Sequence, residues 1–320
     1  MKHRWYYYII LLIAVIVLNF FLPRMLPGSP IGQIMGEEAG RLDGEEKARI
    51  LSAYRLDLPL GQQFLFYLKS LVTFDFGMSY SRRQPVAALL AKAIPWTLLL
   101  AGTDLVLSTV FGTLLGTVSA YKRRKRADVP IIMGTTLVSS VPSFWIGMIL
   151  LTVFGAKLGW LPMYGAYSMW KKYTGWRRIL DVAAHLVLPV VTMLLASLMH
   201  FFTTSRYSVM NTMFSDYVSM AELRGIPKRR IRIRYVMRNA ILPVFTVFMT
   251  ELGFLLSGSV IIETVFSYPG IGFLLFEAVK ARDYPLMQYG FLASSAIVIA
   301  AGALSDFLSA RIDPGMEGGQ

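Results

Sequence analysis

The chain contains six apolar stretches, each close to the ~20 residues that an α-helix needs to cross the hydrocarbon core of a membrane. Inside such a core every backbone polar group must be satisfied within the protein, which favours helices. The sequence therefore predicts an all-α integral membrane protein with six transmembrane helices, at 6–22, 95–120, 130–154, 185–204, 240–262 and 285–310.

Composition supports the membrane prediction. Only 16% of the residues are charged, against about 25% in a soluble domain. The absence of cysteine excludes disulfides, thiolate metal sites and cysteine nucleophiles. The first stretch has the basic start of a signal peptide but no small-x-small cleavage pattern, so we interpret it as a retained span.

The net charge of +13 lies in a few clusters. In an apolar chain, such clusters indicate the cytoplasmic membrane surface and contact with lipid phosphates rather than nucleic acid. The basic N-terminus, 122–126 and 221–243 all fall on one side of a six-span arrangement, which places both termini in the cytoplasm. The loop 155–184 is also basic but lies on the outer side, and its interspersed tryptophans suit an interfacial segment.

The outer segment 24–92 is amphiphilic, with two predicted short helices at 43–54 and 60–72. Its run FLFYLKSLVTF is too apolar to stay solvated. We therefore expect a small extracytoplasmic helical segment after the first transmembrane helix, which occupies 1–23.

The basic stretch AELRGIPKRRIRIRYVMRNAILP (221–243) contains seven Arg or Lys residues and lies in the predicted cytoplasmic loop 206–239. Ser215-Asp216 can cap a short helix running to Arg224, and Gly225 can take the left-handed conformation that ends it. Pro227 fits near the first turn of a second helix. The pattern predicts helix, sharp turn, helix at the cytoplasmic surface, although basic residues beside a span also fit simple lipid anchoring.

Several chemistries find no support in the sequence. There is no G-x-x-x-x-G-K-[ST] nucleotide-binding loop, and the glycines of GTLLGTVS (112–119) instead suit close helix packing. The three histidines are scattered, so no metal site is expected. No clustered nucleophile or acid/base set supports a membrane-bound enzyme.

Charged residues inside spans are costly and are therefore candidates for function. Glu251, and after it Asp104, are the candidate pathway residues, since a carboxylate inside a span could bind a cationic group of a transported solute. The alternative is a buried carboxylate satisfied by hydroxyls or a partner helix. A proton-coupled secondary transporter that uses both residues as a relay also stays open.

The segment DYVSMAELRGIPKRRIRIRYVMRNAILPV resembles the cytoplasmic signature loop of ABC importer permeases, most closely the B-type subunit of the dipeptide/oligopeptide/nickel family. YRLDLPLGQQFLFYL, ETVFSYPGIG and RDYPLMQ match that family in order, and the resemblance covers nearly the whole chain. Two departures stand out: Ser219-Met220-Ala221 replaces the usual Glu-Ala-Ala, and Pro227 stands where a serine is common.

The resemblance implies a type I importer permease core over 93–310 with a C-terminal tail at 311–320, in a bacterial inner membrane. The expected partners are a second, homologous permease forming a heterodimer, two cytoplasmic ATPases and an external substrate-binding protein. ATP and Mg²⁺ belong to the ATPases, and this chain binds no cofactor. It is not itself an enzyme.

The resemblance also assigns roles to residues. The helix 216–226 is expected to couple to an ATPase, through Asp216, Tyr217, Ala221, Glu222, Arg224, Gly225 and Pro227. The outer gate or binding-protein docking site is expected at Ser267, Tyr268, Pro269 and Gly270, a turn signal, together with 24–92. The family favours peptides over nickel or another small solute as substrate.

Overall fold

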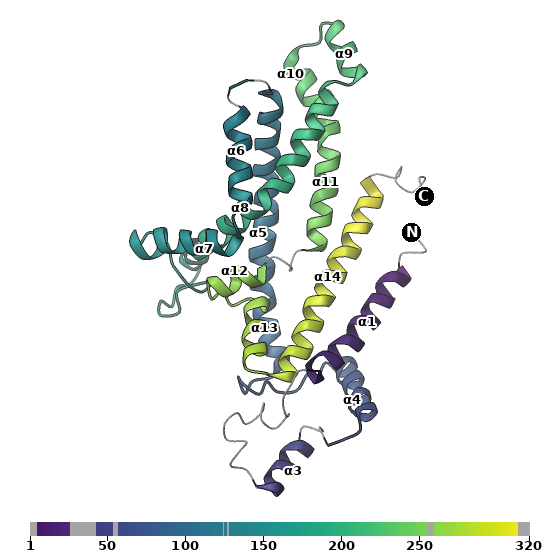
Figure 1. Ribbon diagram of the computed structural model, residues 1–320, viewed down its shortest axis with the longest axis vertical. Helices are drawn as coiled ribbons and strands as arrows, with labels where there is room; N and C mark the ends of the chain where they lie inside the picture. The colour runs from purple at the N-terminus through teal and green to yellow at the C-terminus, as the bar shows by residue number, and fades with distance from the viewer. Residues whose placement is uncertain are drawn as a thin grey trace. The chain divides into compact units, whose positions relative to one another are not determined.

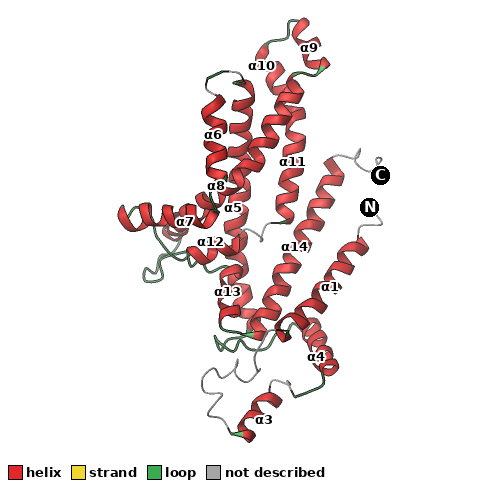
Figure 2. Ribbon diagram, viewed as in Figure 1, coloured by secondary structure: helices red, strands yellow, loops and turns green. Residues whose placement is uncertain are grey.

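The computed structural model describes residues 5–25, 43–53, 57–123, 125–126, 128–254 and 259–312. Among these residues every named element is a helix, and an isolated bridge pairs Met78 with Pro85 (Figure 2). The chain divides into two compact units, residues 1–97 with 269–299 and residues 98–268 with 300–320. The all-α prediction is confirmed.

Within the described residues, the first unit contains six helical pieces. Both short helices predicted after the first apolar stretch are present. The pieces are α1 (Trp5–Arg24), α3 (Gly44–Ala53), α4 (Leu60–Thr73), the start of α5 (Val86–Tyr121), α13 (Ile271–Lys280) and most of α14 (Tyr284–Ile312).

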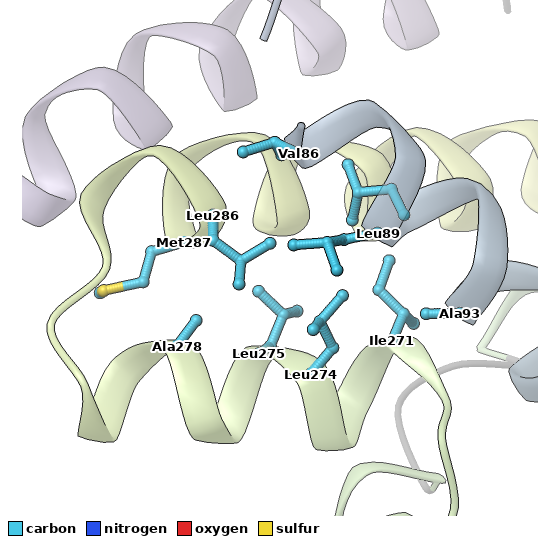
Figure 3. Packing of buried hydrophobic residues seen from close by; sticks show 10 residues of the cluster. Val86, Leu89, Ala93, Ile271, Leu274, Leu275, Ala278, Leu286 and Met287 are labelled. Carbon is cyan, nitrogen blue, oxygen red and sulfur yellow. The ribbon is translucent and has the colours of Figure 1, made fainter. Parts of the chain in front are cut away.

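The core of this unit lies between the start of α5, α13 and α14 (Figure 3). Its buried side chains recur at helical spacing, so each helix presents one apolar stripe to the others. The members are Val86, Leu89, Leu90, Ala93, Ile271, Leu274, Leu275, Ala278, Leu286 and Met287. The Thr97 hydroxyl accepts a hydrogen bond from the backbone N–H of Ile271 at 2.8 Å, which satisfies a donor at the first turn of α13.

Aromatic side chains join α1 to α4. The Phe20 ring meets Phe64 edge-on at 5.0 Å and lies 5.7 Å from the ring of Tyr67. The Arg24 guanidinium lies 3.7 Å above the Phe20 ring and donates to Gln63 Oε1 at 3.0 Å. These contacts bury Tyr67 and cover part of the apolar run of α4, while Leu65 and Val72 stay exposed.

Asp283 ties the loop before α5 to the start of α14. The carboxylate is fully buried. Its Oδ2 accepts from the Ser79 hydroxyl at 2.5 Å, the Ser81 hydroxyl at 2.8 Å and the Ser81 N–H at 2.9 Å. Its Oδ1 accepts from the N–H of Leu286 at 3.2 Å, so the same side chain also caps α14.

The second unit holds the remaining helices, and α9 and α10 lie where α8 ends and α11 begins (Figure 1). Two segments are π-helical, a form that often marks a functional site. The elements after α5 are α6 (Asp128–Ser139), α7 (Ser143–Leu150), the π-helix η2 (Leu151–Lys157), α8 (Trp176–Met213), α9 (Asp216–Leu223), α10 (Lys228–Arg230), the π-helix η3 (Ile231–Met237), α11 (Arg238–Gly253) and α12 (Ser259–Val265).

Two glycines let α5 approach α8 closely. A Cβ built on Gly116 would lie 2.4 Å from the Phe202 carbonyl oxygen, and one on Gly112 would lie 2.5 Å from the Phe201 Cβ. Nothing larger than hydrogen fits at either position without moving the α8 backbone. The predicted packing role of these glycines is confirmed.

The transmembrane helices depart from the six-span prediction. In the described part of the chain, α5, α8 and α14 are long and apolar enough to cross a membrane, and α6 with α7–η2 adds a fourth span if that bent pair counts as one. The helix α1 is apolar but shorter over its qualifying stretch. The spans predicted at 95–120 and 185–204 also began too late, because α5 begins at Val86 and continues through Pro95, and α8 begins at Trp176.

The predicted span over 130–154 is not one straight helix, because α6 and α7–η2 are bent by 97° at a short break. The break falls at Pro142, which precedes the first residue of α7 and disfavours helical geometry at Val141. The hydroxyl of Ser140 donates to the Thr136 carbonyl at 2.8 Å, beside the backbone N–H of Ser140 at 3.1 Å, at the end of α6.

The predicted span over 240–262 contains two described helices, α11 and α12. The helix α11 ends at Gly253, Phe254 forms a turn, and α12 begins separately at Ser259. Residues 255–258, like 313–320 of the predicted tail, lie outside the described residues.

Candidate functional site

The first candidate site is the short helix α9, which follows α8 after a turn at Phe214 and Ser215. Ser215 has the extended backbone of an N-cap residue, but its hydroxyl donates to the Thr212 carbonyl at 2.7 Å. The predicted side-chain cap is wrong, because no backbone N–H of α9 donates to the Ser215 hydroxyl, which instead faces the end of α8. Asp216 in the first turn still lies where a negative charge is favourable.

The end of α9 forms a left-handed turn at Gly225, which has φ +71°. The N–H of Gly225 donates to the Glu222 carbonyl at 2.9 Å, and the N–H of Ile226 donates to the Ala221 carbonyl at 3.2 Å. These two bonds form a Schellman motif, which satisfies carbonyls that the helix leaves free. The predicted role of Gly225 is confirmed.

The second predicted helix begins after Pro227 as α10 and continues through η3 into α11. Its basic residues are exposed, and the Arg232 guanidinium lies 4.9 Å from the Tyr121 ring. The predicted helix–turn–helix is present, and the π-helical turn over 231–237 is an addition that the sequence did not indicate.

One face of α9 packs against its own chain. Val218 and Ala221 are buried in a cluster with Val209 of α8 and with Ile231 and Val236 of η3. These contacts join α9 to the end of α8 and to η3, which leads into α11. Ala221 faces this cluster, so its side chain is not exposed for the direct ATPase contact that the resemblance implies.

The opposite face of α9 is exposed and largely apolar. Leu223 is 83% exposed, and the sequence reasoning missed this face because it weighed the charged residues. The signal was present as apolar residues every third position. The exposed apolar residues are Phe214, Tyr217, Met220 and Leu223, and the exposed predicted residues beside them are Asp216, Glu222, Arg224, Gly225 and Pro227.

A buried ion pair holds together the helices beneath this loop. Arg206 of α8 donates from Nη1 and Nη2 to the two carboxylate oxygens of Asp128, at 2.9 and 3.1 Å. The same Nη1 donates to the Ser119 hydroxyl at 2.6 Å. Because Asp128 begins α6 and Ser119 lies in the last turn of α5, one guanidinium joins three helices. No sequence motif indicated this pairing.

The second candidate site is a cavity of about 250 Å³ inside the second unit. It brings together Asp104 and Glu251, the two carboxylates that the sequence singled out within spans. Its wall is formed by Ala101, Asp104, Leu105, Ser108, Ser143, Met193, Ala196, Ser197, His200, Phe201, Glu251, Phe254 and Ile262.

The two carboxylates of the cavity have different partners. Asp104 is buried, and its Oδ1 accepts from the Ser108 hydroxyl at 2.8 Å and from the Ser197 hydroxyl at 3.3 Å. Glu251 is half-buried, and its Oε1 lies 2.9 Å from Nδ1 of His200. Ser108 lies one turn after Asp104 on α5, whereas Ser197 and the His200 partner of Glu251 come from α8, far away in the chain, and the sequence did not indicate them.

The third candidate site is the turn at 267–270. Ser267 has a left-handed backbone with φ +44° and is exposed, whereas Tyr268 and Gly270 are buried. The N–H of Tyr268 donates to the Glu263 carbonyl at 2.8 Å. Burial raises the pKa of the Tyr268 phenol, and the charge of Glu263 raises it further. The predicted turn is confirmed, but the Tyr268 ring faces the interior.

Comparison with known proteins identifies the family. Residues 112–318 match the binding-protein-dependent transport system inner membrane component family. The chain belongs to this family. It is a multi-pass inner-membrane permease subunit of an ABC importer, and such permeases work with ATPases and substrate-binding proteins.

Relatives match along almost their whole length. The di/tripeptide transport system permease protein DppB of Pseudomonas aeruginosa (strain UCBPP-PA14) is 33% identical, covering 94% of this chain and 93% of the relative. The glutathione transport system permease protein GsiC of Escherichia coli (strain K12) is 35% identical, covering 96% and 94%. The oligopeptide transport system permease protein AppB of Bacillus subtilis (strain 168) is 29% identical, covering 97% and 96%.

A solved structure shares the fold. A chain of an amino acid ABC transporter crystallised with histidines superposes with a TM-score of 0.51 at 12% identity, covering 70% of this chain and 94% of that chain. At this level of identity the likeness concerns the fold alone. It agrees with the all-α permease architecture described above.

Proposed function

We propose that this permease carries peptides, as one half of a heterodimeric pathway served by two cytoplasmic ATPases and an external binding protein. The relatives are named for di/tripeptide, glutathione and oligopeptide transport, and they match the chain over nearly its full length. ATP and Mg²⁺ are bound by the ATPases, which hydrolyse the nucleotide, and both termini of this chain lie in the cytoplasm.

The single observation that carries the coupling part of the proposal is the two-sided character of α9. Its exposed apolar face is unusual at a surface otherwise dominated by basic residues. A helix laid into a groove of a partner is held through such a face. Its buried face contacts α8 and η3, so the partner's movement reaches the two transmembrane helices on either side of the loop.

We assign the contact with the ATPase to Tyr217, Met220 and Leu223, with Glu222 and Arg224 forming polar contacts at the rim. Asp216, Gly225 and Pro227 set the beginning, end and exit of the helix. Ala221 acts from the buried face, as a small residue that lets α9 lie close to Ile231. The basic residues of α10 and η3 serve as lipid anchors.

The outer surface is assigned to the binding protein. Residues 24–92 include the exposed apolar side chains Leu60, Leu65 and Val72 on α4. The turn at 267–270 offers Ser267, while the buried Tyr268 supports the turn from within. Pro269 and Gly270 then set the start of α13 at an outer gate.

The coupling assignment is tested by Leu223→Asp in the complete transporter. A carboxylate at the centre of an apolar contact is expected to reduce ATPase association and ATP-driven peptide uptake by tenfold or more, since a buried unpaired charge is costly. Leu65→Asp is the matched control for ATPase association alone, because Leu65 is also an exposed leucine, at 66%, but lies on the segment assigned to the outside.

Co-purification of the ATPases and uptake of a labelled dipeptide into proteoliposomes are the two measurements. Equal ATPase association in the Leu223→Asp and Leu65→Asp complexes would contradict the assignment of α9. ATP-driven uptake of nickel or another small solute, with no uptake of peptides, would contradict the peptide assignment. Uptake by this chain without any ATPase would instead support a proton-coupled transporter.

A further inference from the structure

The cavity between α5, α7, α8, α11 and α12 carries an excess of negative charge. Two carboxylates, Asp104 and Glu251, line it, and no lysine or arginine is among its lining residues. The serines that hold Asp104 supply hydrogen bonds but no positive charge. A buried carboxylate without a cation nearby is costly, and a cationic ligand would lower that cost.

His200 does not neutralise the negative charge of the cavity. The His200 side chain is 67% exposed and contacts Glu251, whereas Asp104 is held by hydroxyls alone among the described residues. A single imidazole can balance at most one of the two carboxylates. Because His200 is exposed, it can also swing away from Glu251 when another cation arrives, at little cost in packing.

The size and walls of the cavity indicate what kind of cation fits. At about 250 Å³ the cavity far exceeds the ~30 Å³ that one water molecule occupies in the liquid. Much of its wall is apolar, including Leu105, Phe201 and Ile262. Within the described residues, no three His, Asp or Glu side chains converge in a way that would hold a metal ion. The lining therefore suits an organic ammonium group attached to an apolar body.

We propose that this cavity is a transit site for the protonated amine of the transported peptide, with Asp104 and Glu251 as its counter-charges. The inference rests on the peptide permease function proposed above and adds a recognition site within this chain. The ammonium group can donate to the Asp104 and Glu251 carboxylates and to the Ser143 hydroxyl, while the first side chain of the peptide lies against Leu105 and Phe201. The amine comes either from the peptide's amino terminus or from a lysine side chain.

The test measures peptide binding to the purified permease–ATPase complex in nanodiscs. The external binding protein is left out, so that peptide can bind only to the membrane complex. The probes are Ala-Leu, acetyl-Ala-Leu and acetyl-Lys-Leu, measured by equilibrium dialysis. The wild-type complex is expected to prefer Ala-Leu over acetyl-Ala-Leu by about tenfold or more, as for a close charge pair shielded from water.

The decisive comparison is the ratio of the two affinities in the variants. Asp104→Asn and Glu251→Gln keep the size of each side chain and remove its charge, and each is expected to lower the preference for Ala-Leu, with the double variant near a ratio of one. Glu277→Gln on α13 removes a carboxylate that does not line the cavity and should leave the ratio unchanged. If Asp104→Asn fails to assemble, Glu251→Gln, which is more exposed, still decides the question.

The acetyl-Lys-Leu probe separates the two sources of the amine. Binding that depends on the carboxylates shows that a lysine side chain also enters the site, and no binding restricts the site to the amino terminus. Both results support the proposal. An unchanged ratio in Asp104→Asn and Glu251→Gln, no preference in the wild type, or no binding by the wild type would each overturn it.

Uptake measured with the binding protein present distinguishes this inference from the proposed function. ATP-driven uptake of Ala-Leu combined with an unchanged ratio in the variants would refute the transit site alone. Carboxylate-dependent binding without any ATP-driven uptake would instead refute the peptide importer function.

Discussion

The close crossing of α5 and α8 makes Gly116→Ala a demanding test of the packing described here. The new methyl group would lie 2.4 Å from the Phe202 carbonyl oxygen, 2.9 Å from the Ser205 Cβ and 3.0 Å from the Arg206 backbone nitrogen. Two of these atoms belong to the α8 backbone and the third is fixed to it, so no side-chain rotation relieves the clash. The helices must separate by about 1 Å to restore ordinary contact.

The separation of α5 from α8 determines how much Gly116→Ala destabilises the protein. Overpacking of this kind costs about 1–3 kcal/mol, and the gain in helix propensity from glycine to alanine offsets up to about 1 kcal/mol of it. The displacement also reaches Arg206, whose guanidinium pairs with Asp128. We therefore expect a net destabilisation of about 1–2 kcal/mol or more.

Gly102→Ala is the matched control. Gly102 lies on the same helix, but a Cβ at this position meets nothing within 4 Å, so this change is expected to be neutral or slightly stabilising. The assay is the fraction of monodisperse complex that survives heating, followed by size-exclusion chromatography. Equal thermal stability of the Gly116→Ala and Gly102→Ala complexes would refute the reasoning.

Two further substitutions test the buried polar contacts. Arg206→Ala leaves Asp128 buried without its cation and is expected to destabilise the protein by about 3–5 kcal/mol. Its control, Arg49→Ala, removes an ion pair that is more than 80% exposed and should have no measurable effect. Similar melting curves for the two variants would argue against a stabilising role of the Arg206–Asp128 pair. Asp283→Ala deprives the Ser79 and Ser81 donors of their acceptor and is expected to cost roughly 3 kcal/mol and to expose the loop before α5 to proteases. Asp75→Ala, which removes only one exposed bond to the Gly77 N–H, is its control, and equal protease sensitivity would contradict the assigned role.

The sequence predicted the helices of this protein better than their breaks. Apolar length located every main hydrophobic helix, and Gly225 and Pro227 located the turn after α9, because these signals act within a few residues. The interruption at Pro142 was missed because the apolar run continues through it, and composition does not record a change of direction. The end of α11 at Gly253 was missed for the same reason.

The candidate sites divide in a similar way. Charge inside an apolar span was enough to single out Asp104 and Glu251, because such charges are rare and costly. The partners of these carboxylates could not be predicted, since Ser197 and His200 come from another helix and reach the cavity only through the packing of α8. On α9 the sequence indicated the charged residues but not the exposed apolar face, because that face is defined by the burial of Val218 and Ala221 on the other side of the helix.

The sequence by itself determined that this chain is helical, crosses a membrane and carries a basic helix–turn–helix, because hydrophobic length, sparse charge and turn residues act locally. The tertiary structure decided which small and polar residues meet. Gly112 and Gly116 matter through the backbone of α8, and Arg206 through the first residue of α6. Asp104 and Glu251 share one cavity because five helices close around it. Each of these depends on contacts between residues far apart in the chain, and their positions are set by packing that no local pattern encodes.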